Sequence, residues 1–378
     1  MHPFAEVNSL ADAKSVRYAV VGLGWIAQEV VLPAFEHSAH SELTALVTGD
    51  AEKARELGEA YKIPRTYSYE EFDRVLVSEE VDAVYISLPN SMHAEYAIRA
   101  AQAGIHVLCE KPMAASIGEC KEMIRAAEGA GTLLMIAYRL HFEPANLKAI
   151  ELVRSGEIGQ PRTFVSSFSQ NVKPGDIRLK EDLAGGPLMD MSIYQINAAR
   201  YLFRDEPTEV MAFATKPAGD DRFREVYESV AALLRFPDDQ IAAFTTSFGG
   251  AASDEWQLVG TRGAVNLKHA FEYHEEKEMT IIVEGEQKTE SFPKLDQFGA
   301  EIQYFSDCIL EGKNPEPSGQ EGLADIRVIE GLLKSIEENK PVSLVPFEVG
   351  ARPSGEQEMK LPPVKSKKIV HAAAPTAS

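Results

Sequence analysis

The tripeptide Glu110-Lys111-Pro112 is the strongest chemical signal in the sequence. It follows a short apolar run, Ile105 to Cys109, with the composition of a buried strand. A lysine in that place would stand at the carboxyl edge of a parallel sheet, where open α/β folds bind their ligands. An ammonium group beside a dinucleotide can orient a sugar hydroxyl and lower the pKa of a neighbouring acid. The tripeptide therefore indicates redox chemistry on a polyol or sugar.

Asp190 and Tyr194 are the second pair of residues suited to chemistry. They lie four positions apart in a stretch that reads as a helix, so they share one face of it. A carboxylate can accept hydrogen bonds from sugar hydroxyls, and a tyrosine beside a lysine cation is stabilised as the phenolate, a general base. The other interpretation is that Tyr194 is a core aromatic residue of an amphipathic helix, and the residues alone leave both open.

A glycine loop near the amino terminus supplies a place for a dinucleotide. Gly22, Leu23, Gly24, Trp25 and Ile26 begin a G-x-G-x-x-A pattern that ends a predicted strand and opens a predicted helix. The first glycine permits a tight turn, and the second lets backbone amides approach a pyrophosphate at the helix amino terminus. The alternative, a glycine-rich turn without a ligand, is disfavoured by this strand–helix context.

The end of the second predicted strand indicates which dinucleotide binds. Thr48 is small and hydroxylated, and Lys53 falls in the first turn of the next helix, so the two could hold the 2′-phosphate of NADP. Asp50 argues for NAD, whose ribose hydroxyl an acid would bind, unless it only caps the helix. We expect NADP, with NAD as the alternative.

Polar residues follow two later strands. The loop from Pro89 to His93 would pass the nicotinamide side of the cofactor, with Asn90 as a helix cap and His93 either contacting the cofactor or supporting the turn. Arg139 follows the strand Leu133 to Ala137 and could fix a substrate or cofactor oxygen. His141 and Glu143 are expected to be structural.

The pattern of apolar residues changes along the chain and divides it into two parts. Up to about residue 140, apolar strand-like runs such as Arg17 to Gly22 and Val81 to Leu88 alternate with helical stretches such as Trp25 to His37, as in a Rossmann-type doubly wound parallel sheet. From about Pro161 the strand-like runs, such as Glu209 to Thr215, are often alternating, and a helix is expected over Leu188 to Phe203. This half predicts an α+β domain with a large, mostly antiparallel sheet. We expect a short arm over 1–16, domains over 17–140 and 141–350, and a disordered tail over 351–378. A sheet with a second free face predicts a homodimer or homotetramer through the carboxyl-terminal sheet.

Composition excludes several classes of protein. The 378 residues include 38 basic and 58 acidic side chains, a formal charge of -20, which argues against nucleic acid and against an anionic membrane surface as partners. No apolar run approaches the ~20 residues that span a bilayer. Three widely spaced cysteines fit free thiols in the cytoplasm, and neither they nor the scattered histidines predict a metal site.

The sequence resembles the glucose–fructose oxidoreductase / inositol dehydrogenase family over residues 17 to 345. The resemblance rests on GLGWIA at Gly22, LPNSMHAE at Leu88, GIHVLCEKPM at Gly104, YRLHFEP at Tyr138 and LAGGPLMDMSIYQIN at Leu183, the last two closest to the glucose–fructose oxidoreductase branch.

That resemblance implies roles for individual residues. It places Lys111 between nicotinamide and substrate, Asp190 on the substrate and Tyr194 as the acid/base. Thr48 and Lys53 match the residues that hold the 2′-phosphate. The remaining matched positions imply cofactor contacts at Tyr69, Leu88, Asn90, His93, Glu110 and Arg139, with Arg139 also counted as substrate-binding.

The resemblance implies oxidation of a cyclic aldose, glucose or xylose, at C1 to the lactone. Two departures leave the substrate open. Only about 16 residues precede the first strand, where the periplasmic enzyme of the family carries an export signal and a long cofactor-holding arm, and Asp176-Ile177-Arg178 stands where the family has a tryptophan. Alternatives are a reductase or dehydrogenase of another polyol or carbonyl compound, and a non-catalytic regulator that senses NADP or a sugar.

Overall fold

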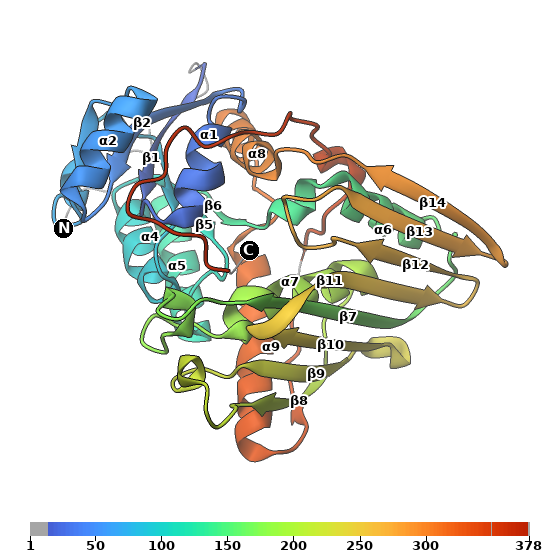
Figure 1. Ribbon diagram of the computed structural model, residues 1–378. Helices are drawn as coiled ribbons and strands as arrows, with labels where there is room; N and C mark the ends of the chain where they lie inside the picture. The colour runs from blue at the N-terminus through green and yellow to red at the C-terminus, as the bar shows by residue number, and fades with distance from the viewer. Residues whose placement is uncertain (1–13, 349, 377–378) are drawn as a thin grey trace. The chain divides into compact units, whose positions relative to one another are not determined.

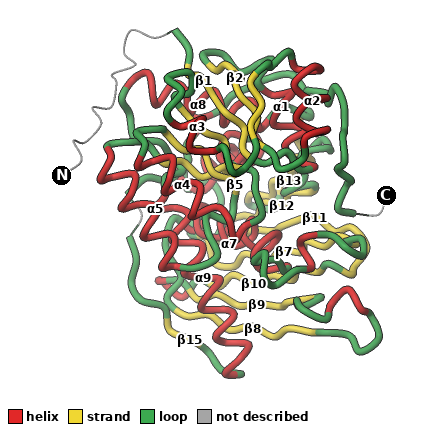
Figure 2. Tube along the Cα trace, turned by 90° about the vertical axis from the view of Figure 1, so that its left-hand side faces the viewer, coloured by secondary structure: helices red, strands yellow, loops and turns green. Residues whose placement is uncertain are grey.

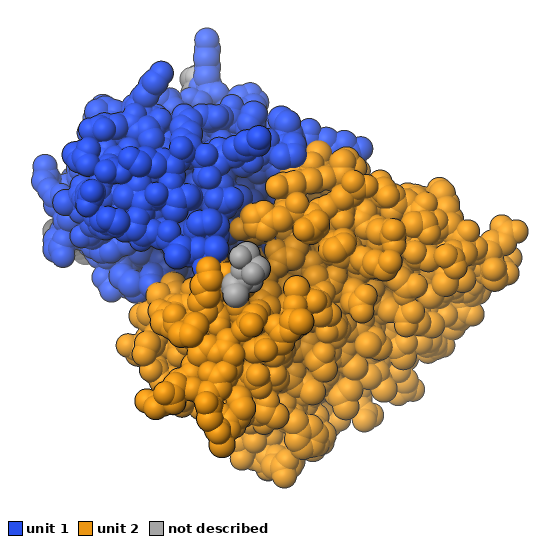
Figure 3. Space-filling model, in the orientation of Figure 1, with its two compact units in different colours: residues 1–139, 296–323, 360–374 blue, residues 140–295, 324–359, 375–378 orange. Residues whose placement is uncertain are grey.

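The computed structural model describes residues 14–348 and 350–376 (Figure 1). The described chain forms two compact units (Figure 3). The first takes in 14–139, 296–323 and 360–374, and the second takes in 140–295, the described part of 324–359, and 375–376. The expected contiguous domains over 17–140 and 141–350 are therefore incomplete, because later segments return to the first unit. Most of the expected arm over 1–16 lies outside the described residues.

The first unit is built on a six-stranded parallel sheet in the order β3-β2-β1-β4-β5-β6. Its strands are β1 (Val16–Val21), β2 (Ser41–Val47), β3 (Arg65–Tyr67), β4 (Ala83–Ile86), β5 (His106–Glu110) and β6 (Leu134–Ala137). The strand order reverses between β1 and β4, which is the point where doubly wound sheets bind ligands. The predicted Rossmann-type sheet is confirmed.

Helical segments connect these strands or come from parts of the chain after the last of them. They are η1 (Ala27–Val31), α1 (Leu32–Ala34), α2 (Ala51–Tyr61), α3 (Phe72–Leu76), η2 (Asn90–Met92), α4 (His93–Gln102), α5 (Ile117–Ala130), η3 (Arg139–Phe142), α8 (Gln297–Glu311) and the start of α9 (Gly319–Glu338). β1 and β4 are almost wholly buried apolar residues, because a parallel sheet is covered on both faces.

The second unit is built on a nine-stranded sheet in the order β14-β13-β12-β11-β7-β10-β9-β8-β15. Its strands are β7 (Pro161–Asn171), β8 (Glu209–Thr215), β9 (Ser229–Arg235), β10 (Ile241–Ser247), β11 (Gly249–Gly260), β12 (Gly263–Lys268), β13 (Lys277–Val283), β14 (Glu286–Phe292) and β15 (Val342–Ser343). Neighbouring strands run antiparallel apart from β7 and β10. The predicted mostly antiparallel sheet is confirmed.

Helices cover one face of this sheet. The unit contains α6 (Pro144–Arg154), η4 (Ile177–Leu179), η5 (Leu188–Ser192), α7 (Ile193–Phe203), η6 (Asp221–Phe223), η7 (Pro237–Asp239), the rest of α9 and η8 (Gly355–Gln357). Figure 2 shows β10, β9 and β8 in succession beside α9. The Ser335 hydroxyl on α9 accepts a hydrogen bond from the Ala212 amide of β8 at 3.1 Å. Along β9, buried and exposed residues alternate strictly, so the face away from the helices is open.

The carboxyl-terminal segment differs from its prediction. A disordered tail was expected over 351–378, but the structure places 360–374 on the first unit, in dark red beside α1 in Figure 1. Leu361 accepts a hydrogen bond from the Asp296 amide at 3.0 Å, and the Val370 backbone is buried against Gln28. Composition predicted disorder because the segment has little apolar surface, whereas the contacts that hold it are polar.

Across the described ranges, no helix is both long and apolar enough to cross a bilayer.

Candidate active site

The glycine loop has the geometry of a phosphate cradle. Gly22 follows β1 with a φ of 92°, and a Cβ there would lie 2.4 Å from the Ser87 carbonyl oxygen, so only glycine fits. A Cβ on Gly24 would meet no atom within 4 Å, which leaves room at this position for a ligand. Ile26 directly precedes η1 as its N-cap residue, while Leu23 is buried and Trp25 is half-buried. The loop fits a dinucleotide pyrophosphate.

The residues after β2 gather around the start of α2. Thr48 is buried at the strand end, and its Oγ1 accepts a hydrogen bond from the Asp50 amide at 3.3 Å. Asp50 is the N-cap, with its Oδ1 accepting from the Glu52 and Lys53 amides at 3.0 Å. The Tyr69 ring lies against the same turn, 3.1 Å from where a Cβ on Gly49 would stand. The capping role suggested for Asp50 is therefore present, with Thr48, Lys53 and Tyr69 around it.

The loop after β4 is fastened by a buried histidine. The ring nitrogens of His93 lie 2.9 Å from the Leu88 carbonyl oxygen and 2.8 Å from the Pro112 carbonyl oxygen. Its side chain is fully buried, and burial lowers its pKa. Of the two roles expected for His93, this geometry favours support of the turn. Asn90, at the start of η2, and Leu88 remain the cofactor candidates of this loop.

Glu110 and Lys111 follow β5 directly, as the sequence predicts. The Glu110 carboxylate accepts a hydrogen bond from the Tyr85 hydroxyl at 2.8 Å, and Glu301 of α8 lies 3.0 Å from the same hydroxyl. Burial raises the pKa of Glu110, although the Lys111 and Arg139 cations oppose this shift. Lys111 is half-buried at the strand end. The lysine thus stands beside a buried acidic cluster that the sequence did not reveal.

Arg139 ends the first unit and is buried. Its guanidinium donates to the Gln297 side chain and lies over the Phe298 ring, 5.7 Å from the ring centre. The two residues that follow it serve structure, as expected: His141 donates from Nε2 to Asn197 Oδ1 at 2.7 Å, and Glu143 caps α6. The Arg139 guanidinium is thus bound by the side chains of Gln297 and Phe298. Its expected contacts with cofactor and substrate stay predictions.

Asp190 and Tyr194 lie on consecutive helical segments of the second unit. Asp190 belongs to the π-turn η5 and Tyr194 to the first turn of α7, so the predicted single helix is interrupted in type but continuous in path. The Tyr194 ring packs 6.2 Å from the ring centres of Phe168 and Phe271. Both Asp190 and Tyr194 are half-buried.

Arg178 is the partner of Asp190 that the sequence analysis noted but did not interpret. Its Nε donates to Asp190 Oδ2 at 2.8 Å and its Nη1 to Asp176 Oδ1 at 3.2 Å. The Asp176-Ile177-Arg178 departure from the family pattern therefore adds an ion pair to the expected substrate carboxylate. The spacing of Asp176 and Arg178, two positions apart, was the sequence signal that could have indicated an ion pair here.

Among the described residues, no group of three or more histidine, cysteine or acidic side chains is arranged to hold a metal ion. Cys109, Cys120 and Cys308 are buried, and none of them is in a disulfide.

Comparisons with known proteins agree with this geometry. Residues 16–138 match the profile described as "Oxidoreductase family, NAD-binding Rossmann fold", and residues 146–266 match "GFO/IDH/MocA C-terminal domain". A D-xylose 1-dehydrogenase [NADP(+)] of Haloarcula marismortui is 32% identical over 342 residues, which cover 88% of this chain and 94% of that protein. The chain therefore belongs to the GFO/IDH/MocA oxidoreductase family, and the resemblance seen in the sequence is confirmed.

Two solved structures of oxidoreductases are also similar to this chain. The aldose–aldose oxidoreductase of Caulobacter crescentus, solved with glycerol, is 39% identical with a TM-score of 0.84, covering 87% of this chain and 100% of that one. A 3-ketoreductase of Actinomadura kijaniata, solved with NADP and TDP-benzene, is 27% identical with a TM-score of 0.78, covering 85% of this chain and 98% of that one. These neighbours are oxidoreductases of sugars or of keto compounds.

Proposed function

We propose that this protein is an NADP-dependent oxidoreductase that oxidises a cyclic aldose, glucose or xylose, at C1 to the lactone. The observation that carries the proposal is Lys111, which directly follows β5 in the unit that also holds the glycine loop. Support for the substrate class comes from two similar proteins, the xylose dehydrogenase and the aldose–aldose oxidoreductase.

Each residue then has one task. Tyr194 takes the proton of the anomeric hydroxyl, Asp190 accepts hydrogen bonds that fix the ring, and Lys111 acts at the nicotinamide end, where its charge favours the ionised form of the reacting oxygen. When bound, the nicotinamide accepts the hydride that leaves C1. The aldose loses one hydride and one proton, and the product is the lactone.

The chain's own residues support NADP as the bound form. The cradle at Gly22 and Gly24 suits the pyrophosphate. Thr48 and Lys53 offer a hydroxyl and a cation to a 2′-phosphate, and Tyr69 stands beside them. Leu88, Asn90 and Glu110 are proposed to line the nicotinamide side.

The first experiment is to purify the protein, denature it and measure released NADP(H), in parallel with turnover of glucose and xylose on added NADP+ or NAD+. Retained NADP(H) that one sugar reduces and a second sugar reoxidises would mean a coupled oxidoreductase. Empty protein that turns over added NADP+ would mean a simple aldose dehydrogenase. Cofactor binding without turnover of any sugar would contradict the proposal and favour a regulator.

Lys111→Met tests the central residue. We expect kcat for the aldose to fall about 10²- to 10⁴-fold through lost acid–base assistance, with the protein still folded. Stopped-flow or steady-state kinetics with NADP+ measure this loss. Lys121→Met, at an exposed position of α5, is the control and should leave kcat unchanged. Full activity of Lys111→Met would remove the lysine from the mechanism.

Reduction of a keto sugar is the second candidate, because a dTDP-3,4-didehydro-2,6-dideoxy-alpha-D-glucose 3-reductase of Actinomadura kijaniata is 29% identical over 85% of this chain. The two candidates are separated by offering an aldose with NADP+ and a keto sugar with NADPH. The reaction with the higher kcat/KM identifies which of the two candidate functions holds.

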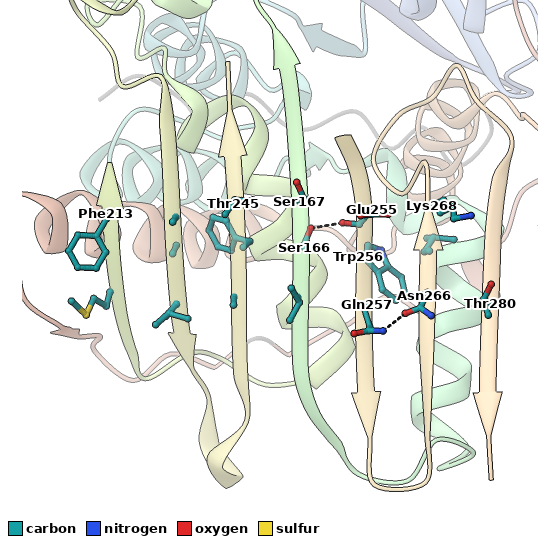
Figure 4. A pocket seen from close by; sticks show the side chains of 18 residues that line it. Ser166, Ser167, Phe213, Thr245, Glu255, Trp256, Gln257, Asn266, Lys268 and Thr280 are labelled. Atoms are coloured by element: carbon teal, nitrogen blue, oxygen red, sulfur yellow. Dashed lines mark hydrogen bonds between the residues drawn. The ribbon is translucent and has the colours of Figure 1, made fainter. Parts of the chain in front are cut away.

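The open face of the nine-stranded sheet supports a homo-oligomer as the working form. Figure 4 shows the side chains that line a hollow on this face. The exposed fractions of Val165 on β7, Leu233 on β9 and Phe213 on β8 are 51%, 50% and 59%, which is unusual for large apolar side chains of one sheet. We propose that a second copy of the chain covers this face.

A further inference from the structure

The carboxyl-terminal segment is tied to the glycine loop through one buried side chain. The Gln28 amide donates to the Val370 carbonyl at 3.0 Å and accepts from the Val370 amide at 2.7 Å, so it pairs with the backbone as a strand would. Its nitrogen also donates to the Leu23 carbonyl at 2.7 Å. Because Gln28 is fully buried, this link fixes the segment at a defined position on the loop.

Two ion pairs fasten the segment further back. The Lys367 ammonium lies 2.6 Å from Glu36 Oε1 and over the Tyr61 ring, 4.7 Å from its centre. Lys368 pairs with Glu56 on α2. The path of the segment is thus set by several independent contacts within the first unit, and it leads to the start of α2.

His371 ends this path on the helix cap. Its Nδ1 lies 2.7 Å from Asp50 Oδ2 and its Nε2 lies 3.4 Å from Glu52 Oε2. Asp50 uses Oδ1 for the helix amides, so Oδ2 is the oxygen open to the histidine. Lys53 is the other charged group that acts on the imidazole, and it opposes protonation. The imidazole thus faces two carboxylates and one ammonium group.

The negative charge of Asp50 disfavours the proposed binding of NADP unless the charge of His371 offsets it. A carboxylate at the end of the second strand binds the ribose 2′-hydroxyl of NAD and repels a 2′-phosphate. Thr48 and Lys53 favour the phosphate, yet Asp50 stands between them in the sequence. A cation placed on Asp50 removes this repulsion.

We propose that His371 is a positioning residue for cofactor choice: its imidazolium neutralises Asp50 beside Thr48 and Lys53, so that this strand end accepts the 2′-phosphate of NADP. The inference rests on the proposed use of NADP and extends it to the carboxyl-terminal segment. His371 and Asp50 lie 321 positions apart, so the pair exists only in the folded chain.

The pair also predicts a pH dependence. The hydrogen bond to Asp50 and its charge raise the pKa of His371 above the ordinary value, so the imidazolium persists to higher pH than in a free histidine. As the pH rises through that raised pKa the charge is lost and the repulsion by Asp50 returns. The affinity for NADPH should then fall while the affinity for NADH does not.

The test is the dissociation constant of NADPH and of NADH, measured on the full chain by cofactor fluorescence without any sugar. For His371→Gln at pH 6.5 we expect NADPH binding to weaken about three- to tenfold, the size of one nearby charge in a solvated site, with NADH binding changed less than about twofold. His371 is about half exposed, so this variant should fold.

The chain offers a matched control. His40 Nδ1 lies 2.8 Å from Asp307 Oδ1, with side-chain exposed fractions of 55% and 30%, against 53% and 33% for His371 and Asp50. His40→Gln removes an equivalent pair away from the cofactor site and should leave both dissociation constants unchanged.

Two further variants separate charge from packing. His371→Lys keeps a cation at higher pH, so its NADPH affinity should follow only the ionisation of the 2′-phosphate itself, with a pKa of about 6. Asp50→Asn keeps a capping residue and removes the charge, so adding His371→Gln to it should have no further effect.

Equal weakening of NADPH and NADH in His371→Gln would show a packing role only and overturn the proposal. So would an NADPH/NADH preference that His371→Gln leaves unchanged. A wild-type protein that binds neither cofactor would contradict the proposed function itself, which is a separate outcome.

Discussion

Tyr85 carries one hydroxyl proton but has two carboxyl neighbours, Glu110 at 2.8 Å and Glu301 at 3.0 Å. The hydroxyl can donate to only one of them, so the other carboxyl must be protonated and donate to the tyrosine oxygen. Burial and the charge of Glu110 raise the pKa of Glu301 well above its usual range. The pKa of Glu110 is raised less, because the Lys111 charge opposes that shift, so we assign the proton to Glu301.

This assignment predicts how stability depends on pH. A group whose pKa is raised in the folded protein stabilises it fully below the unfolded pKa, and this contribution is lost as the pH rises through the folded pKa. For Glu301 this loss of stability begins as the pH rises above the ordinary pKa of a glutamate side chain. The glutamine of Glu301→Gln cannot ionise. In this variant the free energy of unfolding should therefore fall less steeply with rising pH, by up to about 1.4 kcal/mol per pH unit.

Urea unfolding of both proteins between pH 5 and 9 measures the slope. Glu59→Gln is the control, because Glu59 is 70% exposed and its loss should leave the slope intact. Parallel curves for wild type and Glu301→Gln would contradict the assignment of the proton to Glu301.

Arg178 gives the second prediction at the scale of single residues. Its guanidinium fixes the Asp190 carboxylate at 2.8 Å, so Arg178→Ala should raise KM for the sugar about tenfold through a lost charge-assisted hydrogen bond. NADPH affinity should not change. Arg222→Ala is the matched control, since Arg222 pairs with Asp220 in the same D-x-R spacing. Equal effects of the two variants would exclude a specific role for Arg178.

Two helical stretches that the sequence pattern located still differ in type from the prediction. The stretches expected as helices over 25–37 and 188–203 both contain a π-turn, η1 and η5. The first also ends at Ala34, before the expected His37. Periodicity locates a helical path but does not distinguish a turn of one extra residue, because the same side chains suit both. Both π-turns lie at proposed ligand positions, the glycine loop and Asp190, where such turns are frequent.

Apolar patterns predicted the elements that carry apolar residues. β1, β4 and β8 appear at or within two residues of their expected bounds, whereas β14 was missed because its sequence, EQKTESF, is polar and lies at a sheet edge. Lys111 follows an expected strand, and Asp190 and Tyr194 lie within an expected helix. The contacts of Glu301 and His371 join residues more than 200 positions apart, and no local pattern encodes such pairs.

Helix α6 provides a prediction for a single element. The Glu143 carboxylate caps it, accepting from the Ala145 and Asn146 amides at 3.0 Å and from the Asn146 side chain at 2.7 Å. Glu143→Ala should lower the free energy of unfolding by about 1–2 kcal/mol, the value of a lost N-cap. Urea unfolding measures it, with Glu151→Ala on the exposed face of α6 as the control. Equal midpoints for both variants would show that the cap contributes nothing.

At the scale of the whole molecule, the open sheet face carries a continuous apolar row. Val165 on β7, Ala243 on β10, Leu233 on β9 and Met211 on β8 are register neighbours across four adjacent strands. The same chain has a formal charge of -20, which keeps copies apart unless a specific surface joins them. A self-complementary apolar face is such a surface, and a two-fold axis through it lets identical rows cover each other.

Leu233→Glu tests whether this face joins subunits. Leu233 is 50% exposed at the centre of the row, so in a single subunit the new carboxylate is solvated and folding should be unaffected. In an assembled face the charge is buried without a partner, so the variant should sediment as species of lower mass than the wild-type assembly in sedimentation velocity. Val77→Glu, at a residue 76% exposed in the first unit, adds the same charge elsewhere and should leave the mass unchanged. A wild-type mass of about 41.5 kDa, or an assembly that Leu233→Glu does not disturb, would exclude the β7–β8 face as the interface.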